Sequence, residues 1–135
     1  MKNAVIYWSG TGNTEMMATA IAEGAGAELF TVSEFSGNIA DYDRIAFGCP
    51  AMGAEVLEED GFEPFFTSIE SSLSGKTVAL FGSYGWGDGE WMRNWEDRVK
   101  ADGAVLFGDE GLIVNETPSD DDLAKCRELG ANLAK

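Results

Sequence analysis

Seven residues near the start of the chain, Trp8-Ser9-Gly10-Thr11-Gly12-Asn13-Thr14, combine hydroxyl side chains with glycines. They follow an apolar run at 4–7 that predicts a buried strand, and they precede residues 15–25, where apolar residues recur at helical spacing. A helix N-terminus offers free backbone N–H groups and a positive dipole end to an anion, and hydroxyl groups add further donors. The segment therefore predicts a phosphate site, and an ordinary turn that caps a helix is the alternative. The candidate ligand-binding residues are Ser9, Gly10, Thr11, Gly12, Asn13 and Thr14.

Two familiar phosphate loops do not match this segment. The nucleoside-triphosphate loop requires a lysine after its last glycine, and residues 8–14 contain neither lysine nor arginine. The dinucleotide motif G-x-G-x-x-G aligns with Gly10 and Gly12 but meets Glu15 at its third glycine. A neutral loop of this kind suits a single terminal monophosphate, held by directed hydrogen bonds.

Two further glycine-rich loops follow predicted strands at 44–48 and 77–82. The loop at 49–55 contains a flexible Met-Gly step, and the loop at 83–91 places Trp86 between glycines. In a parallel sheet the carboxyl ends of the strands share one edge, and ligands bind there where the strand order reverses. We therefore expect the three loops to converge on one ligand.

The three segments W-S-G-T-G-N-T at 8–14, G-C-P-A-M-G at 48–53 and F-G-S-Y-G-W-G-D-G-E-W-M at 81–92 resemble a short-chain flavodoxin of anaerobic bacteria. The similarity covers nearly the whole chain. It implies a low-potential one-electron carrier, not an enzyme, with non-covalently bound FMN that shuttles between hydroquinone and semiquinone. The alternative is an FMN-dependent reductase of quinones or nitro compounds, which needs a second ligand pocket beside the flavin. A receiver domain of the same fold needs an acidic cluster after the first strand, and Trp8-Ser9-Gly10 stands there instead.

The resemblance also implies which residues contact FMN. Ser9, Thr11, Asn13 and Thr14 correspond to phosphate donors, Met52 and Trp86 to the residues on the two faces of the ring, and Glu55 to an acceptor for ring N3–H. A core tryptophan is the alternative interpretation of Trp86. Outside the first loop the implied contacts are Pro50, Ala51, Met52, Gly53, Ala54, Glu55, Ser83, Tyr84, Gly85, Trp86, Gly87 and Asp88.

Alternating strand and helix patterns predict an α/β fold, with residues 1–135 as one flavodoxin-like domain. The expected sheet is doubly wound, parallel and five-stranded, in the order 2-1-3-4-5, with helices on both faces. Residues 33–43 are expected to form a loop or a short helical turn. The predicted strands are 3–7, 27–32, 44–48, 77–82 and a split strand at 104–107 and 112–115, and the predicted helices are 13–25, 63–73, 90–101 and 120–134.

Charge and composition restrict the partners. The net charge is −15, from 24 acidic and 9 basic residues, which argues against nucleic acid and favours redox proteins with basic docking faces. No apolar run approaches the roughly 18–20 residues of a membrane span, and no signal peptide is recognisable, so a cytoplasmic monomer is expected. The acidic residues expected near the flavin rim, which are the candidates for the docking face, are Glu55, Glu58, Glu59, Asp60, Asp88 and Glu90.

The residue inventory limits catalysis. The chain has no histidine, which removes the usual acid–base catalyst and the commonest metal ligand, so no metal site is expected. Its two cysteines, Cys49 and Cys126, lie at a strand end and on an apolar helical stripe, where buried structural thiols are expected. The sequence therefore predicts a protein whose chemistry belongs to a bound cofactor.

Overall fold

The computed structural model describes residues 2–135 and shows six strands and four α-helices. All paired strands are parallel, in the order β2-β1-β3-β4-β5, with β6 also pairing with β4. This confirms the predicted order and the split of the last strand. The strands are β1 (Asn3–Tyr7), β2 (Glu28–Thr31), β3 (Arg44–Gly48), β4 (Thr77–Tyr84), β5 (Val105–Leu106) and β6 (Leu112–Asn115), and the helices are α1 (Asn13–Ala25), α2 (Phe62–Ile69), α3 (Glu90–Ala101) and α4 (Asp120–Leu133).

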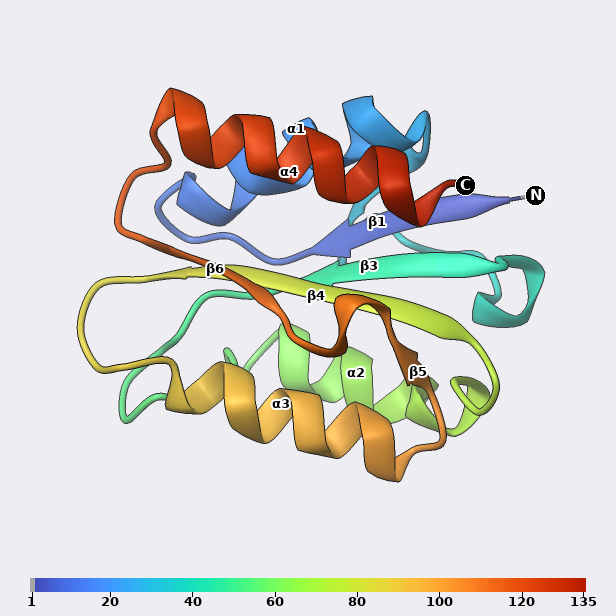
Figure 1. The fold of residues 1–135 in the computed structure, drawn as a ribbon. Coiled ribbons are helices and arrows are strands. Elements are labelled where there is room, and N and C mark those ends of the chain that lie inside the picture. Colours follow the sequence, from blue (N-terminus) through green and yellow to red (C-terminus); the bar gives the residue numbers. More distant parts are fainter. Residues whose placement is uncertain (1) are drawn as a thin grey trace.

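The helices form two layers around the sheet. Figure 1 shows α1 and α4 on one face and α2 and α3 on the other. The loops that follow β1, β3, β4 and β6 emerge at one edge of the sheet, opposite the two chain ends (Figure 1). This is the edge at which the three glycine-rich loops are expected to converge.

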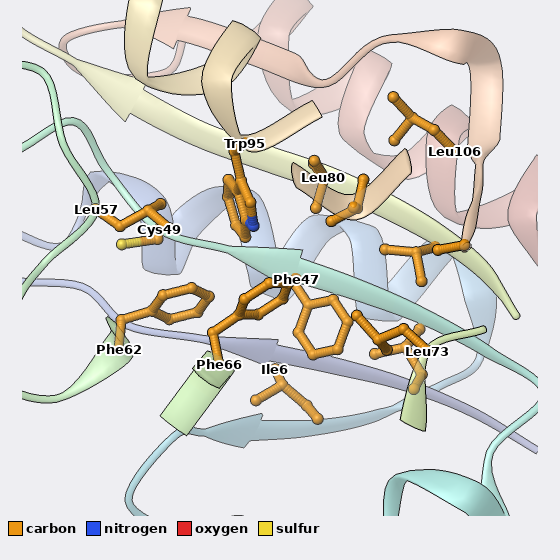
Figure 2. Packing of buried hydrophobic residues seen from close by; sticks show 14 of the residues in the cluster. Ile6, Phe47, Cys49, Leu57, Phe62, Phe66, Leu73, Leu80, Trp95 and Leu106 are labelled. Carbon is orange, nitrogen blue, oxygen red and sulfur yellow. The ribbon is translucent and has the colours of Figure 1, made fainter. Parts of the chain in front are cut away.

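An aromatic cluster fills the space between the sheet and the α2–α3 layer (Figure 2). The ring of Phe47 on β3 meets the ring of Phe66 edge-on, with centroids 5.3 Å apart. Trp95 on α3 packs edge-on against Phe62 and Phe66 at 5.3 and 5.8 Å. Such edge-to-face contacts place these large side chains in defined positions, so α2 and α3 are held firmly against β3.

On the opposite face, α1 and α4 touch through their backbones. A Cβ atom on Gly24 would lie 2.0 Å from the carbonyl oxygen of Arg127, and one on Gly130 would lie 2.1 Å from that of Ile21. Only glycine permits this approach. Cys126 is fully buried in the same layer, and burial raises the pKa of its thiol to about 11. Cys49 is fully buried on the other face, so both thiols are buried as predicted.

Two element boundaries differ from the sequence prediction by more than one residue. The helix expected at 63–73 is α2 followed by a 3₁₀ turn at Glu70–Ser72, and β4 continues two residues further, to Tyr84. Residues 33–43 contain one 3₁₀ turn, Ile39–Asp41, whose first turn is capped by the Asn38 side chain. This short helical turn between β2 and β3 is one of the two alternatives that the sequence predicts for residues 33–43.

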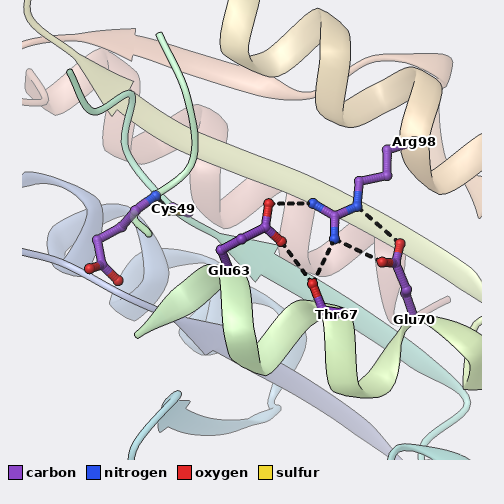
Figure 3. Close-up of polar contacts among 6 residues, drawn as sticks. Cys49, Glu63, Thr67, Glu70 and Arg98 are labelled. Atoms are coloured by element: carbon purple, nitrogen blue, oxygen red, sulfur yellow. Dashed lines mark hydrogen bonds and ion pairs between the residues drawn. The ribbon is translucent and has the colours of Figure 1, made fainter. Parts of the chain in front are cut away.

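An ion-pair network joins α2 to α3 (Figure 3). Arg98 Nη1 lies 2.8 Å from a Glu63 oxygen, and Arg98 Nη2 lies 2.8 Å from a Glu70 oxygen. The hydrogen bond from Arg98 holds the pKa of Glu70 below its ordinary value. Asp102 follows the last turn of α3, and burial together with the neighbouring Glu70 raises its pKa to about 6.

Replacing Asp102 with asparagine is expected to stabilise the protein above pH 6. A pKa raised on folding means that the stabilising contribution of Asp102 is present below pH 3.8 and is lost as the pH rises through about 6. At pH 7 the wild-type carboxylate lies near Glu70 and at a helix C-terminus, so its removal gains roughly 1 kcal/mol after solvent screening. Urea unfolding from pH 4 to 8 measures the difference, with the exposed Asp97→Asn as control. A difference that stays constant across this range would contradict the assignment.

Candidate functional site

A pocket of about 230 Å³ lies where the loops after β1, β3, β4 and β6 meet. Its lining includes members of all three glycine-rich loops and carries no lysine or arginine. The pocket is therefore neutral or acidic on every side, although it faces a helix N-terminus. The lining residues are Trp8, Gly10, Thr11, Asn13, Pro50, Ala51, Met52, Ser83, Tyr84, Gly85 and Glu116.

The first loop is organised around the hydroxyl of Ser9. Ser9 Oγ accepts hydrogen bonds from the N–H groups of Gly12 and Glu15, both at 3.2 Å. Gly12 precedes α1 with a φ of 99°, a conformation that favours glycine. Within residues 2–135 the N–H groups of Thr11, Asn13 and Thr14 find no acceptor, so they remain for a ligand. These donors fit a phosphate group at the positive end of α1.

Thr14 joins the first loop to the third. Its side chain is 1% exposed, and its Oγ1 lies 3.0 Å from the Oγ of Ser83, which is 5% exposed. The N–H of Ser83 also donates to Thr14 Oγ1, at 3.3 Å. Ser83 lines the pocket, whereas Thr14 lies behind it and contacts Ser83.

The second loop is a tight turn. Met52 and Val56 exchange two backbone hydrogen bonds, of 2.8 and 3.0 Å, and the Met52 side chain is 37% exposed beside the pocket. Gly53 has a φ of 49°, and Glu55 has a φ of 55°, which is unusual for a residue with a side chain. A strained residue of this kind persists only where its surroundings hold it.

The carboxylate of Glu55 supplies that hold. Its Oε1 accepts hydrogen bonds from the N–H groups of Gly89 at 3.2 Å and Glu90 at 3.0 Å, at the start of α3. A Cβ atom on Gly87 would lie 2.4 Å from Glu55 Cδ, so glycine is required where the two loops touch. Both hydrogen bonds use Oε1 of Glu55. The hydrogen bond from flavin N3–H to Glu55 stays a prediction, with Oε2 as the expected acceptor.

The third loop exposes an aromatic ring. Trp86 is 67% exposed, which excludes the interpretation as a core tryptophan. Trp91, by contrast, is 1% exposed, and its Nε1–H donates to the Cys49 carbonyl at 3.1 Å. Asp88 pairs with Arg93 at 2.9 Å, and the hydrogen bond from Arg93 holds the pKa of Asp88 below its ordinary value. Trp86 is therefore free to cover a ligand.

Two pocket residues lie outside the predicted set. Trp8 packs its ring beside Gly10, where a Cβ atom would lie 3.0 Å from Trp8 Cη2. Glu116 follows β6 with a φ of 58°, and its N–H donates to the Tyr84 carbonyl at 2.7 Å. The sequence could have predicted that Glu116 lines the pocket. This residue directly follows the last predicted strand, and that strand ends at the same edge of the sheet as the three loops.

The prediction for Glu58 was wrong. This residue was expected on an exposed docking face, but it is 7% exposed, and its carboxylate accepts bonds from the N–H groups of Asp60, Gly61 and Phe62 at 2.7–2.8 Å. Burial alone would raise the pKa of Glu58, but these bonds hold it below its ordinary value. Glu58 therefore caps α2 from inside the protein. The other expected acidic residues are half-buried Glu55 and exposed Glu59, Asp60, Asp88 and Glu90.

The structure also bears on metal binding and on membrane insertion. Across residues 2–135, histidine, cysteine, aspartate and glutamate side chains form no cluster of three or more suited to a metal ion. Among the helices of the described part of the chain, none has the length and apolarity needed to cross a membrane. The converging loops lie at the carboxyl edge of a doubly wound parallel sheet, which is where such sheets bind their ligands. Fold and site together define the class as a ligand-binding α/β protein with a doubly wound sheet.

Comparison with known proteins agrees with this class. The flavodoxin family model matches residues 5–130. The chain is 49% identical to the flavodoxin of Megasphaera elsdenii, over 97% of both chains, and 48% identical to that of Clostridium beijerinckii, over 96% of this chain and 97% of the relative. The solution structure of two-electron reduced Megasphaera elsdenii flavodoxin superposes with a TM-score of 0.83 at 46% identity, covering 98% of each chain.

The chain belongs to the flavodoxin family. Flavodoxins carry electrons by means of non-covalently bound FMN and are not enzymes, so the comparisons support the electron-carrier interpretation and not the reductase alternative. The neutral cluster of N–H donors at α1 fits the single phosphate of this cofactor. When bound, FMN supplies the redox chemistry, and the protein supplies the position and the electrostatic surroundings.

Proposed function

We propose that the three loops hold FMN in the pocket between them, and that the protein transfers single electrons at low potential. The observation that carries the proposal is the set of free N–H groups at Thr11, Asn13 and Thr14 beside a pocket without cations. In this arrangement the phosphate lies against the first loop, and Met52 and Trp86 cover the two faces of the ring. The other proposed contacts are Ser9, Gly10, Gly12, Pro50, Ala51, Gly53, Ala54, Glu55, Ser83, Tyr84, Gly85, Gly87 and Asp88.

The experiment is a titration of apoprotein with FMN, followed by tryptophan fluorescence. Stoichiometric quenching and a yellow protein are expected, together with a change of colour on half reduction. The holoprotein should not oxidise a reduced nicotinamide by itself, because electron transfer then requires a partner protein. Steady oxidation of a nicotinamide would instead support the reductase.

The acidic surface completes the proposal. A net charge of −15 disfavours added negative charge on the ring and lowers the potential of the second one-electron step. It also attracts redox partners with basic faces, at rates that fall with added salt. The exposed carboxylates of Glu59, Asp60, Asp88 and Glu90 form the proposed docking rim. In this proposal residues 1–135 form one domain, and the protein acts as a cytoplasmic monomer.

FMN is expected to bind more tightly as the ionic strength rises at pH 7. The phosphate is a dianion that meets neutral donors inside a protein of charge −15, so long-range repulsion opposes binding. Salt shortens the screening length from about 10 Å at 0.1 M and weakens this repulsion. Dissociation constants of FMN and riboflavin at several salt concentrations test this, and riboflavin serves as the uncharged control. Weaker FMN binding at high salt would reveal a cationic partner for the phosphate.

A further inference from the structure

The indole ring of Trp8 lies between two glycines that belong to different segments of the chain. Gly10 is in the first loop, and a Cβ atom on it would lie 3.0 Å from Trp8 Cη2 and 3.3 Å from Cζ3. Gly61 directly precedes α2, and a Cβ atom on it would lie 3.3 Å from Trp8 Cδ1 and from Nε1. Cη2 and Cζ3 belong to the six-membered ring and Cδ1 and Nε1 to the five-membered ring, so opposite ends of the indole contact the two segments.

Space, and not backbone conformation, requires glycine at these two positions. Neither Gly10 nor Gly61 has a positive φ, and the φ of Gly61 is −115°. The three atoms nearest to a Cβ atom on Gly10 all belong to the Trp8 side chain. A Cβ atom on Gly61 would also lie 3.1 Å from Glu58 Oε1. A side chain at either position would therefore push the indole ring or the backbone beside it out of place.

The two ends of the ring differ in how firmly their neighbours are held. The N–H groups of Gly61 and Phe62 both donate to Glu58 Oε1 at 2.7 Å, and Glu58 and Phe62 are buried. The turn before α2 is therefore fixed. Gly10 is exposed, and the half-buried Trp8 packs against the buried core. Trp8 thus connects a fixed turn to an exposed loop.

We propose that Trp8 is a positioning residue that sets the distance between the first loop and the turn before α2. The indole ring spans this distance from Gly61 to Gly10. It thereby places the N–H groups of residues 11–14 where they meet the phosphate of the ligand. Trp8 acts on the phosphate through the backbone at Gly10 and not through a contact of its own. This inference rests on the proposed FMN site.

The test compares FMN with riboflavin in wild type, Trp8→Phe, Gly10→Ala and the double variant. The measured quantity is the ratio of the two dissociation constants, from the fluorescence of the three other tryptophans in the apoprotein. Riboflavin lacks the phosphate, so the ratio reports the position of the first loop. A direct contact of Trp8 with the rest of the flavin affects both ligands alike and cancels in the ratio.

Both single variants should lose part of the preference for FMN. Trp8→Phe should lower it about fivefold, because a phenyl ring is shorter than an indole and cannot contact both glycines. Gly10→Ala should lower it about tenfold, because the added methyl group overlaps with Cη2 of Trp8 and displaces the loop.

The double variant gives the sharpest prediction. A phenyl ring does not extend to the position of Cη2, so it leaves the space that the methyl group added at residue 10 needs. In the Trp8→Phe background, Gly10→Ala should therefore change the ratio by less than about twofold. The loss in the double variant is then smaller than the product of the two single losses.

Gly61→Ala tests the other end of the ring. Gly61 does not line the pocket, but the added methyl group should lower the ratio about threefold because it pushes the indole towards Gly10. Gly37→Ala is the matched control. Gly37 also lacks a positive φ and lies beside an aromatic ring, but its Cβ atom would be 3.5 Å from Phe35 Cζ, an ordinary contact. It should leave the ratio unchanged, alone or with Trp8→Phe.

Three results would overturn the proposal. Equal losses of FMN and riboflavin affinity in Trp8→Phe would make Trp8 a direct wall of the pocket. Single losses that multiply in the double variant would make Trp8 and Gly10 independent. An unchanged ratio in Gly61→Ala would remove the connection to α2.

Urea unfolding keeps the test decisive if Gly10→Ala does not fold. Recovery of folded protein on adding Trp8→Phe would then support the proposed contact, and no recovery would overturn it. Failure of the wild type to bind FMN is a different result, since it would reject the proposed FMN site itself.

Discussion

Trp86→Ala is expected to weaken FMN binding by roughly 100-fold, from the lost area of one ring face and about 1–1.5 kcal/mol of aromatic contact. Trp86 is 67% exposed, so its side chain contributes little to the fold. The unfolding free energy of the apoprotein should therefore change by less than about 0.5 kcal/mol. Fluorescence titration and urea unfolding of the apoprotein measure these two quantities.

The same substitution should raise the potential of the second one-electron step. An electron-rich indole face disfavours negative charge on the ring next to it, and alanine removes that face. Trp86→Phe is the matched control, because it keeps an aromatic face and should retain most of the affinity. Potentiometric titration of the three proteins measures the shift. A lower potential in Trp86→Ala would mean that solvent access, and not the indole, controls the ring at this position.

The predictions that succeeded concern features set by local sequence. Strand, loop and helix at 3–25 follow from a short apolar run, small residues and helical spacing, and each of these acts on its own neighbours. The strand order was predicted from the alternation of strands and helices together with the resemblance to flavodoxins. The capping box formed by Ser119 and Asp122 at α4 is equally local.

The predictions that failed or fell short concern contacts made across the fold. Glu58 was expected on the docking face because it lies with Glu59 and Asp60 near the expected flavin rim. Nothing in this acidic run shows that one of its carboxylates turns inward. Oε1 of Glu55 accepts hydrogen bonds from N–H groups at the start of α3, which lie 34 and 35 residues away in the sequence. Such partners become visible only when loops from different strands are placed together at one edge of the sheet.

Glu58→Ala is expected to cost about 3 kcal/mol of unfolding free energy at pH 7, because it removes hydrogen bonds to a charged group and leaves buried N–H groups unpaired. The affected groups are the N–H groups of Gly61 and Phe62, where α2 begins. Glu58→Gln should cost roughly 2 kcal/mol, since its amide keeps only one acceptor atom. Glu59→Gln is the control, because this neighbour is exposed and should change stability by less than about 0.5 kcal/mol.

The pH dependence separates the carboxylate from simple packing. The pKa of Glu58 is lowered on folding from 4.5, so its contribution is present above that pH and is lost as the pH falls through the folded-state pKa. The stability gap between wild type and Glu58→Gln should accordingly shrink on acidification below pH 4.5, and a gap independent of pH would contradict this assignment. The change should also reach the ligand site, because a Cβ atom on Gly61 would lie 3.3 Å from Trp8 and 3.1 Å from Glu58 Oε1. Trp8 lines the pocket, so a turn loosened at Gly61 removes its support, and FMN affinity should fall together with stability.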